Sequence, residues 1–312
     1  KKLRRKDMGK NYSEVKTGKW MILSGLGWTL VLLLASFYGI KYHSVDILGN
    51  SLKKGEILSR MRINMLRSIE LEKAAVMAIT DKESEYFAEQ SLKASDDTEH
   101  DLNELDLLPG SADEKKLRGE FHDCWKECRK IDKVLLDFAV QNTNLKAASL
   151  SYTKGADVVR RFEHSILNLT GIFNDARTIT LVYQAITALL KIHNLQAPHI
   201  NETDDKQMNA IEAVMKTEEN QVKTSMIALS DIADERGRAS IDEAETAFAE
   251  FMEVNAEVIR LSRLNTNIRS AELSMGRKRK AAAQCEEILT SMQEAVRNET
   301  GLLSKGMRGN FR

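Results

Sequence analysis

Two arginines seven residues apart are the strongest candidates for binding chemistry in this sequence. On a helix, Arg60 and Arg67 lie two turns apart and share one face, and Asn64 lies beside them. A guanidinium binds a carboxylate through two parallel hydrogen bonds, so an arginine pair between helices or subunits suits a dicarboxylate. We predict an anion-binding site here, and a solvated charged face is the alternative.

Other basic residues are weaker candidates of the same kind. Arg129 and Arg277 are expected level with the first pair, on two longer helices, and we include them in the predicted ligand site. A more distant set could also contact a ligand, although some of its members should only pair with nearby acids. That set comprises Arg160, Arg161, Arg177, Tyr183 and Arg260.

Three cysteines are spaced for a cross-link. Cys124 and Cys128 lie one helical turn apart, and Cys285 is expected near the same level on another helix. In an oxidising compartment, a bond from Cys285 to Cys124 or Cys128 would brace the helices and leave one thiol. The alternative is three small buried residues without a cross-link. The spacing fits no haem attachment motif and only weakly fits zinc.

Signatures of catalysis are missing from the sequence. It contains no glycine-rich phosphate loop, no Ser/His/Asp hydrolase pattern and no rigid metal-ligand spacing. We therefore expect no enzyme activity, no cofactor and no bound metal. The chain has 46 basic and 46 acidic residues, and its one basic cluster precedes an apolar run, so a nucleic-acid partner is not expected.

The N-terminal region reads as a membrane anchor. Residues 20–40 contain no charge, and about 30 Å of helix at ~1.5 Å per residue spans a bilayer. Residues 1–19 hold eight Lys or Arg and two acids, which predicts a cytoplasmic start. We predict an uncleaved transmembrane helix over 20–42, favoured over a signal peptide, with the rest of the chain outside the cell membrane, in a bacterial periplasm.

The remainder is expected to be all α-helical. Only two prolines interrupt it, and apolar residues recur every three or four positions. Capping boxes at Thr80–Glu83, Ser111–Glu114 and Ser240–Glu243 mark helix starts, and turns are expected at Arg236–Arg238 and after Pro198. The predicted helices run over 43–79, 82–107, 112–170, 174–199, 203–233 and 241–300.

The chain also contains an internal duplication. Residues 142–151 recur as 265–274, and the same offset of 123 positions maps Thr80 onto Thr203 and Leu66 onto Leu189. Chance similarity between amphipathic helices is the alternative, but chance would not keep one register across two helices and a loop.

These elements predict two stacked four-helix bundles that share two long helices. The helical domain, 43–300, would contain an inner module (43–141 with 270–300) and an outer module (142–269). Residues 301–312 would be a tail or the approach to a second span, and the absence of an initial Met favours a fragment.

This plan resembles the helical bimodular sensor domain of bacterial methyl-accepting chemotaxis receptors. The stretch from Arg60 through Glu72-Lys73-Ala74 to Thr80-Asp81 is similar to the first-helix pattern of four-helix-bundle receptors. The resemblance implies a periplasmic sensor of organic acids or amino acids that works as a homodimer. It further implies signalling to a cytoplasmic kinase complex through a C-terminal region that this sequence does not contain.

We therefore expect the ligand-binding region of a chemotaxis receptor, anchored in the inner membrane. Two alternatives remain open: a structural or scaffold protein of the periplasm, and the sensor region of a histidine kinase. A reading frame that continues into a second apolar span after Arg312 would favour a sensor.

Overall fold

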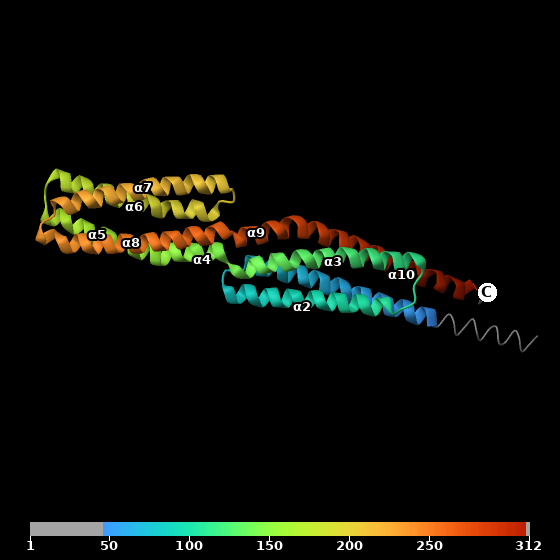
Figure 1. The fold of residues 1–312 in the computed structure, drawn as a ribbon. Helices are drawn as coiled ribbons and strands as arrows, with labels where there is room; N and C mark the ends of the chain where they lie inside the picture. Colours follow the sequence, from blue (N-terminus) through green and yellow to red (C-terminus); the bar gives the residue numbers. More distant parts are fainter. Residues whose placement is uncertain (1–45, 310–312) are drawn as a thin grey trace, which may run out of the picture. The chain divides into compact units, whose positions relative to one another are not determined.

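The structure is a computed structural model that describes the backbone of residues 46–309 and side chains as far as residue 301. Within this part all regular structure is helical and no strand occurs (Figure 1). The elements are a first helix over 46–77, α2 (Asp81–Asp106), α3 (Ala112–Gln141), α4 (Thr143–Leu150), the π-helical turn η1 (Ser151–Gly155), α5 (Ala156–Ile172), α6 (Ala176–Asn201), α7 (Asp205–Ile232), α8 (Glu235–Leu264), α9 (Thr266–Leu273), η2 (Ser274–Lys278) and α10 (Arg279–Gly309).

Six long helical segments therefore make up the described chain, as predicted. The segments α3–α5 and α8–α10 are continuous apart from one residue each, Asn142 and Asn265. No helix of the described residues has the length and apolar content needed to cross a bilayer. The predicted cytoplasmic segment 1–19 and the predicted span 20–42 lie outside the described residues.

Of the three predicted capping boxes, Ser111–Glu114 forms both of its hydrogen bonds and Thr80–Glu83 forms one of them. The Thr80 hydroxyl accepts a hydrogen bond from the Glu83 amide at 3.2 Å. At the start of α3, Ser111 Oγ accepts from the Glu114 amide at 3.1 Å, and Glu114 Oε2 accepts from the Ser111 amide at 3.3 Å. Each pair satisfies amides that a helix start otherwise leaves unbonded.

The predicted turn at Arg236–Arg238 and the helix start at Ser240 are wrong. Asp234 caps α8 instead, and its carboxylate accepts from the Arg236 amide at 2.9 Å, so the helix already includes Gly237. A side chain at Gly237 would not fit, because its Cβ would lie 2.6 Å from Cε2 of Phe173.

Pro198 does not end its helix, contrary to the prediction. It lies inside α6, which continues to Asn201. A proline lacks only one amide hydrogen, and so close to a helix end the remaining backbone bonds are sufficient to continue the turn.

The described chain divides into two compact units. Unit 1 contains 46–62, 98–121 and 287–309, and unit 2 contains 63–97 and 122–286. The inner and outer modules expected from the sequence stay a prediction. In unit 1 the buried Lys54 ammonium binds the carboxylate of Glu114 at 2.8 Å, beside the apolar side chains of Leu58 and Leu105.

Unit 2 contains a four-helix bundle of α5, α6, α7 and α8. Phe162, Leu189, Val222 and Phe251 come one from each of these helices, and all are fully buried in one apolar cluster. A second, smaller cluster joins the first helix, α2 and α3 around Leu135. Apolar burial of this kind supplies most of the driving force for a helical bundle.

The duplication found in the sequence is also a repeat of backbone structure. Asn142 and Asn265, 123 positions apart, both adopt the left-handed conformation, with φ of 51° and 54°. The π-helical turns η1 and η2 stand at the same offset. We call residues 142–144 and 265–267 the Asn-Thr-Asn junction.

The two halves of the junction bind each other reciprocally. The amide of Thr143 donates to Oγ1 of Thr266 at 3.2 Å, and the amide of Thr266 donates to Oγ1 of Thr143 at 3.2 Å. Asn144 and Asn267 exchange a similar pair of bonds at 3.1 and 3.3 Å. The left-handed residue interrupts the series of helical backbone hydrogen bonds, so the amides that follow it have no helical acceptor. Side chains of the other repeat accept hydrogen bonds from these amides.

Candidate functional site

Arg60, the first predicted ligand residue, is held by acids of unit 1. Its Nε donates to Oδ1 of Asp101 at 2.9 Å, and a terminal nitrogen contacts Glu104 at 2.5 Å. A third acid, Glu56, lies one turn away on the same helix at 3.4 Å. A ligand carboxylate would therefore have to compete with protein carboxylates for this guanidinium.

Arg67 and Asn64 belong to unit 2 and differ from Arg60 in their surroundings. Arg67 is exposed and makes no hydrogen bond or ion pair with any described residue. Asn64 is half-buried. The apolar neighbours Ile63 and Leu66 are 64% and 44% exposed, so Arg67 emerges from a partly apolar surface.

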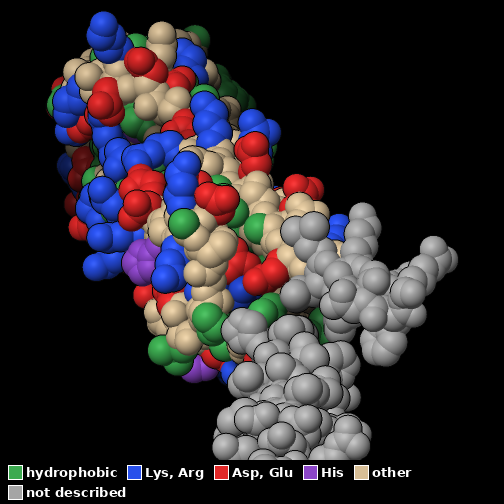
Figure 2. All heavy atoms as spheres, turned by 90° about the vertical axis from the view of Figure 1, so that its right-hand side faces the viewer, with side chains coloured by type: hydrophobic (Ala, Val, Ile, Leu, Met, Phe, Trp, Pro, Cys, Tyr) green, Lys and Arg blue, Asp and Glu red, His purple; other side chains and the backbone are tan. Residues whose placement is uncertain are grey.

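Arg129 and Arg277, the remaining predicted residues, are paired with acids. Arg129 of α3 contacts Asp96 of α2 at 2.6 Å. Arg277 of η2 contacts Glu127 at 3.1 Å, although its side chain stays 67% exposed. Basic and acidic side chains are likewise interspersed over the face of the molecule in Figure 2. Of the four predicted arginines, Arg67 alone has no acidic partner among the described residues.

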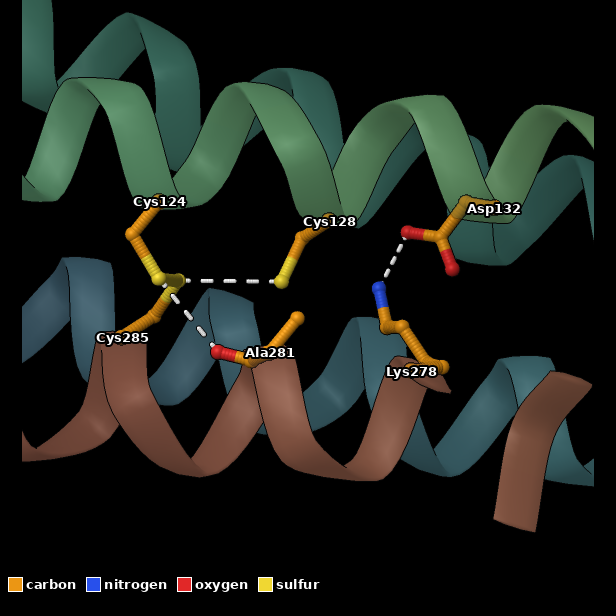
Figure 3. Close-up of a disulfide and its surroundings, with 6 residues drawn as sticks. All are labelled: Cys124, Cys128, Asp132, Lys278, Ala281 and Cys285. Atoms are coloured by element: carbon orange, nitrogen blue, oxygen red, sulfur yellow. Dashed lines mark hydrogen bonds and ion pairs between the residues drawn. A yellow bond between two sulfur atoms is a disulfide. The ribbon is translucent and has the colours of Figure 1, made fainter. Parts of the chain in front are cut away.

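The cysteines lie together in unit 2, where α3 faces α10. Cys124 and Cys285 form a disulfide, and the buried thiol of Cys128 lies 3.6 Å from Sγ of Cys285 (Figure 3). Both α3 cysteines that the sequence predicts as possible partners of Cys285 thus lie beside it. Burial raises the pKa of the Cys128 thiol to about 11, which keeps it protonated at neutral pH.

A buried group of charges, which sequence reasoning missed, lies one helical turn beyond Cys128. Lys278 of η2 binds Asp132 of α3 (Figure 3), and the first helix adds Glu72. Relative exposures are 0% for Glu72 and 1% each for Asp132 and Lys278. The Lys278 ammonium also lies 5.6 Å from the centre of the Trp125 ring, within the range of a cation–π contact.

This group is incompletely hydrogen-bonded. Neither carboxylate oxygen of Glu72 has a hydrogen-bond partner of normal geometry among the described residues. One oxygen of Asp132 binds Lys278, and the other has no such partner in this part of the chain. Burial raises the pKa of Glu72, and the neighbouring Asp132 raises it further, while Ser274 and Lys278 oppose the shift. Burial also raises the pKa of Asp132, against the effect of Lys278.

Two surface grooves are found on the four-helix bundle of unit 2. One, of about 620 Å³, lies between α5 and α8 and contains Arg160, Arg161, His164 and Ser165. In it Arg161 is already paired with Glu250. The other, of about 680 Å³, lies between α6 and α7; its lining includes Tyr183, Lys191, Thr217 and Glu218.

The described residues contain no group of three or more His, Cys, Asp or Glu side chains placed to hold a metal ion. Comparison of the sequence with protein-family models finds no matching family, and comparison with curated proteins finds no significant match. The part of the chain that the structure describes is thus an all-α protein of six long helical segments, with a disulfide and a buried charged group in unit 2.

Proposed function

We propose that this protein is the membrane-anchored, periplasmic ligand-binding region of a chemotaxis receptor. The observation that carries the proposal is the repeat of two short helices and one long helix, joined through the Asn-Thr-Asn junction. The sequence resembles a sensor family with this arrangement, which stacks two four-helix bundles on two shared long helices. The disulfide between two of its helices is in keeping with an oxidising periplasm.

Signal transmission in this proposal uses the long helices. A ligand shifts a conformational equilibrium only if it binds the two states unequally. A ligand held against the first helix would change how that helix packs, and the predicted span over 20–42 would carry the shift to the cytoplasm. A kinase complex would receive it through a further C-terminal region.

The ligand site is proposed at Arg67, with Asn64 beside it. Arg67 has an uncommitted guanidinium, whereas Arg60, Arg129 and Arg277 are neutralised by protein acids. A small organic acid or amino acid would supply the missing carboxylate. The exposed Ile63 and Leu66 support a homodimer through this face, in which the two copies of Arg67 would flank one ligand.

The test is a thermal-shift screen of the full chain in a mild detergent, against organic acids and amino acids. A ligand at a hundred times its Kd should stabilise the fold by ~2.7 kcal/mol, a shift of a few degrees. Arg67→Ala should then weaken binding by ~1.5–3 kcal/mol through loss of a charge-assisted hydrogen bond. Arg236→Ala, which removes an exposed arginine of α8 paired with Asp234, is the matched control.

Different results would redirect the proposal. An affinity loss in Arg161→Ala, with Arg67→Ala unchanged, would place the ligand in the α5–α8 groove. No stabilisation by any compound, together with capture of a protein partner, would favour a periplasmic scaffold. If the chain binds a ligand and the full-length protein ends in a histidine kinase, the sensor role stands. Only the output partner then differs from the proposal.

A further inference from the structure

The buried polar side chains beside η1 differ from those beside η2, although the backbones of the two repeats correspond. Ser151, Gln196 and Asn255, which we call the neutral set, are all buried and form a continuous chain of hydrogen bonds. Ser151 Oγ donates to Oε1 of Gln196 at 2.6 Å, and Nε2 of Gln196 donates to Oδ1 of Asn255 at 2.8 Å. This set carries no charge, and its side chains bind one another.

The other repeat has charges at the corresponding positions. The offset of 123 places Asp132 on Asn255, Ser274 on Ser151 and Lys278 on Gly155. Glu72 lies on the helix that corresponds to α6, one position from the counterpart of Gln196. We call Glu72, Asp132, Ser274 and Lys278 the charged set. Because the same backbone frame folds around a neutral set, the architecture itself does not require these charges.

Charge balance indicates what the charged set does. It contains two buried carboxylates and one ammonium, so one negative charge is left over when both acids are ionised. An uncompensated buried charge is strongly unfavourable. Lys278 already donates to Asp132, whereas Glu72 has no hydrogen-bonded partner of normal geometry, so Glu72 is the side chain that must be neutralised.

We propose that the charged set is a proton-binding site, in which Glu72 holds one proton and its release leaves an uncompensated carboxylate between the first helix, α3 and η2. The ligand here is the proton, so the inference goes beyond the proposed carboxylate site and does not depend on it. Charged groups that act on Glu72 are Lys73 on its own helix, Asp132 on α3 and Lys278 on η2. Around Asp132 and Lys278 lie Cys128 and Arg129 of α3, with Glu127 near Cys128 and Asp96 paired with Arg129.

The sign of the pH effect follows from linkage. Burial raises the pKa of Glu72 in the folded chain above its ordinary value of 4.5. Above pH 4.5 the unfolded chain has released this proton while the folded chain still holds it. The contribution of Glu72 to the free energy of unfolding is therefore greatest below pH 4.5. It is lost as the pH rises through the pKa of Glu72 in the folded chain.

The experiment compares the full chain with Glu72→Gln and with the control Glu70→Gln, which removes an exposed carboxylate from the same helix. Within this pH window, the unfolding constant of the wild type should rise relative to that of Glu72→Gln by up to tenfold per pH unit. Glu70→Gln should follow the wild type. Equal pH dependence in wild type and Glu72→Gln would overturn the proposal.

A second measurement does not depend on the stability of that variant. Trp125 is buried beside Lys278, and replacing Trp20 and Trp28 by Phe leaves it as the only tryptophan. Its fluorescence should titrate with one proton above pH 4.5. Asp132→Asn, which copies the neutral set, frees Lys278 to pair with Glu72 and should move the titration to lower pH. A flat signal, or a titration that Asp132→Asn leaves in place, would overturn the proton site.

Discussion

Asn265 offers the sharpest test of how the junction holds the two repeats together. It sits in the left-handed region with φ of 54°. Its Nδ2 donates to the Glu202 carbonyl at 2.7 Å, and its Oδ1 accepts from Nδ2 of Asn144 at 2.7 Å. A substitution therefore acts through two separable terms, the backbone conformation and the two side-chain hydrogen bonds.

The magnitudes of the two terms can be worked out separately. An alanine in this conformation costs about 1 kcal/mol more than asparagine or glycine. Loss of the two buried hydrogen bonds costs about 1 kcal/mol each. Asn265→Ala should thus lower the free energy of unfolding by about 3 kcal/mol, and Asn265→Gly, which keeps the backbone term, by about 2 kcal/mol.

Urea denaturation followed by far-ultraviolet circular dichroism measures both values. The control is Asn220→Ala, at an exposed and right-handed position of α7, where the higher helix propensity of alanine predicts a small gain in stability. If alanine and glycine at 265 are equally destabilising, the backbone term is refuted. If neither variant loses stability, the junction hydrogen bonds do not stabilise the fold.

Two further predictions concern the disulfide and α8. Cys124→Ser should retain a cross-link, because Sγ of Cys128 lies 3.6 Å from Sγ of Cys285, and peptide mapping without reductant should find the new pair. Cys285→Ser prevents both bonds and should cost roughly 3–5 kcal/mol, since the native bond closes a separation of 161 residues; unchanged unfolding would contradict this. Gly237→Ala should cost roughly 1–3 kcal/mol in the same denaturation assay, because its Cβ would lie 2.6 Å from the Phe173 ring. No loss of stability there would mean that the ring moves aside freely.

The helical segments were predictable because their signals are local. Apolar periodicity and the caps at Thr80 and Ser111 involve residues a few positions apart. The start of α8 was misplaced because Asp234 and Ser240 are both acceptable caps, and the choice between them depends on how the glycine between them packs against Phe173. That contact joins α8 to Phe173, the residue that follows α5, and a local sequence pattern does not show it.

The candidate site was predictable only in residue type. Spacing placed Arg60 and Arg67 on one helical face. It could not reveal that Asp101 and Glu104, on another helix, form ion pairs with the guanidinium of Arg60. The charged set was missed for the same reason, since Glu72 and its partners come from distant parts of the sequence. One signal was available: Asp132 aligns with the neutral Asn255 when the two repeats are superposed in sequence.

The duplication accounts for why some features are common to both repeats while others differ. At the junction each repeat supplies the hydrogen-bonding groups that the other needs, as with Thr143 and Thr266, so a change in one copy would leave a buried amide of the other unbonded. The side-chain hydrogen bonds described for the two buried polar sets are not exchanged in this way between the sets. The hydrogen bonds of the neutral set, and the Lys278–Asp132 bond of the charged set, each stay within one set. A charged version can therefore arise in one set without disturbing the other. A duplicated helical domain can in this way keep one backbone frame and give its two copies different chemistry.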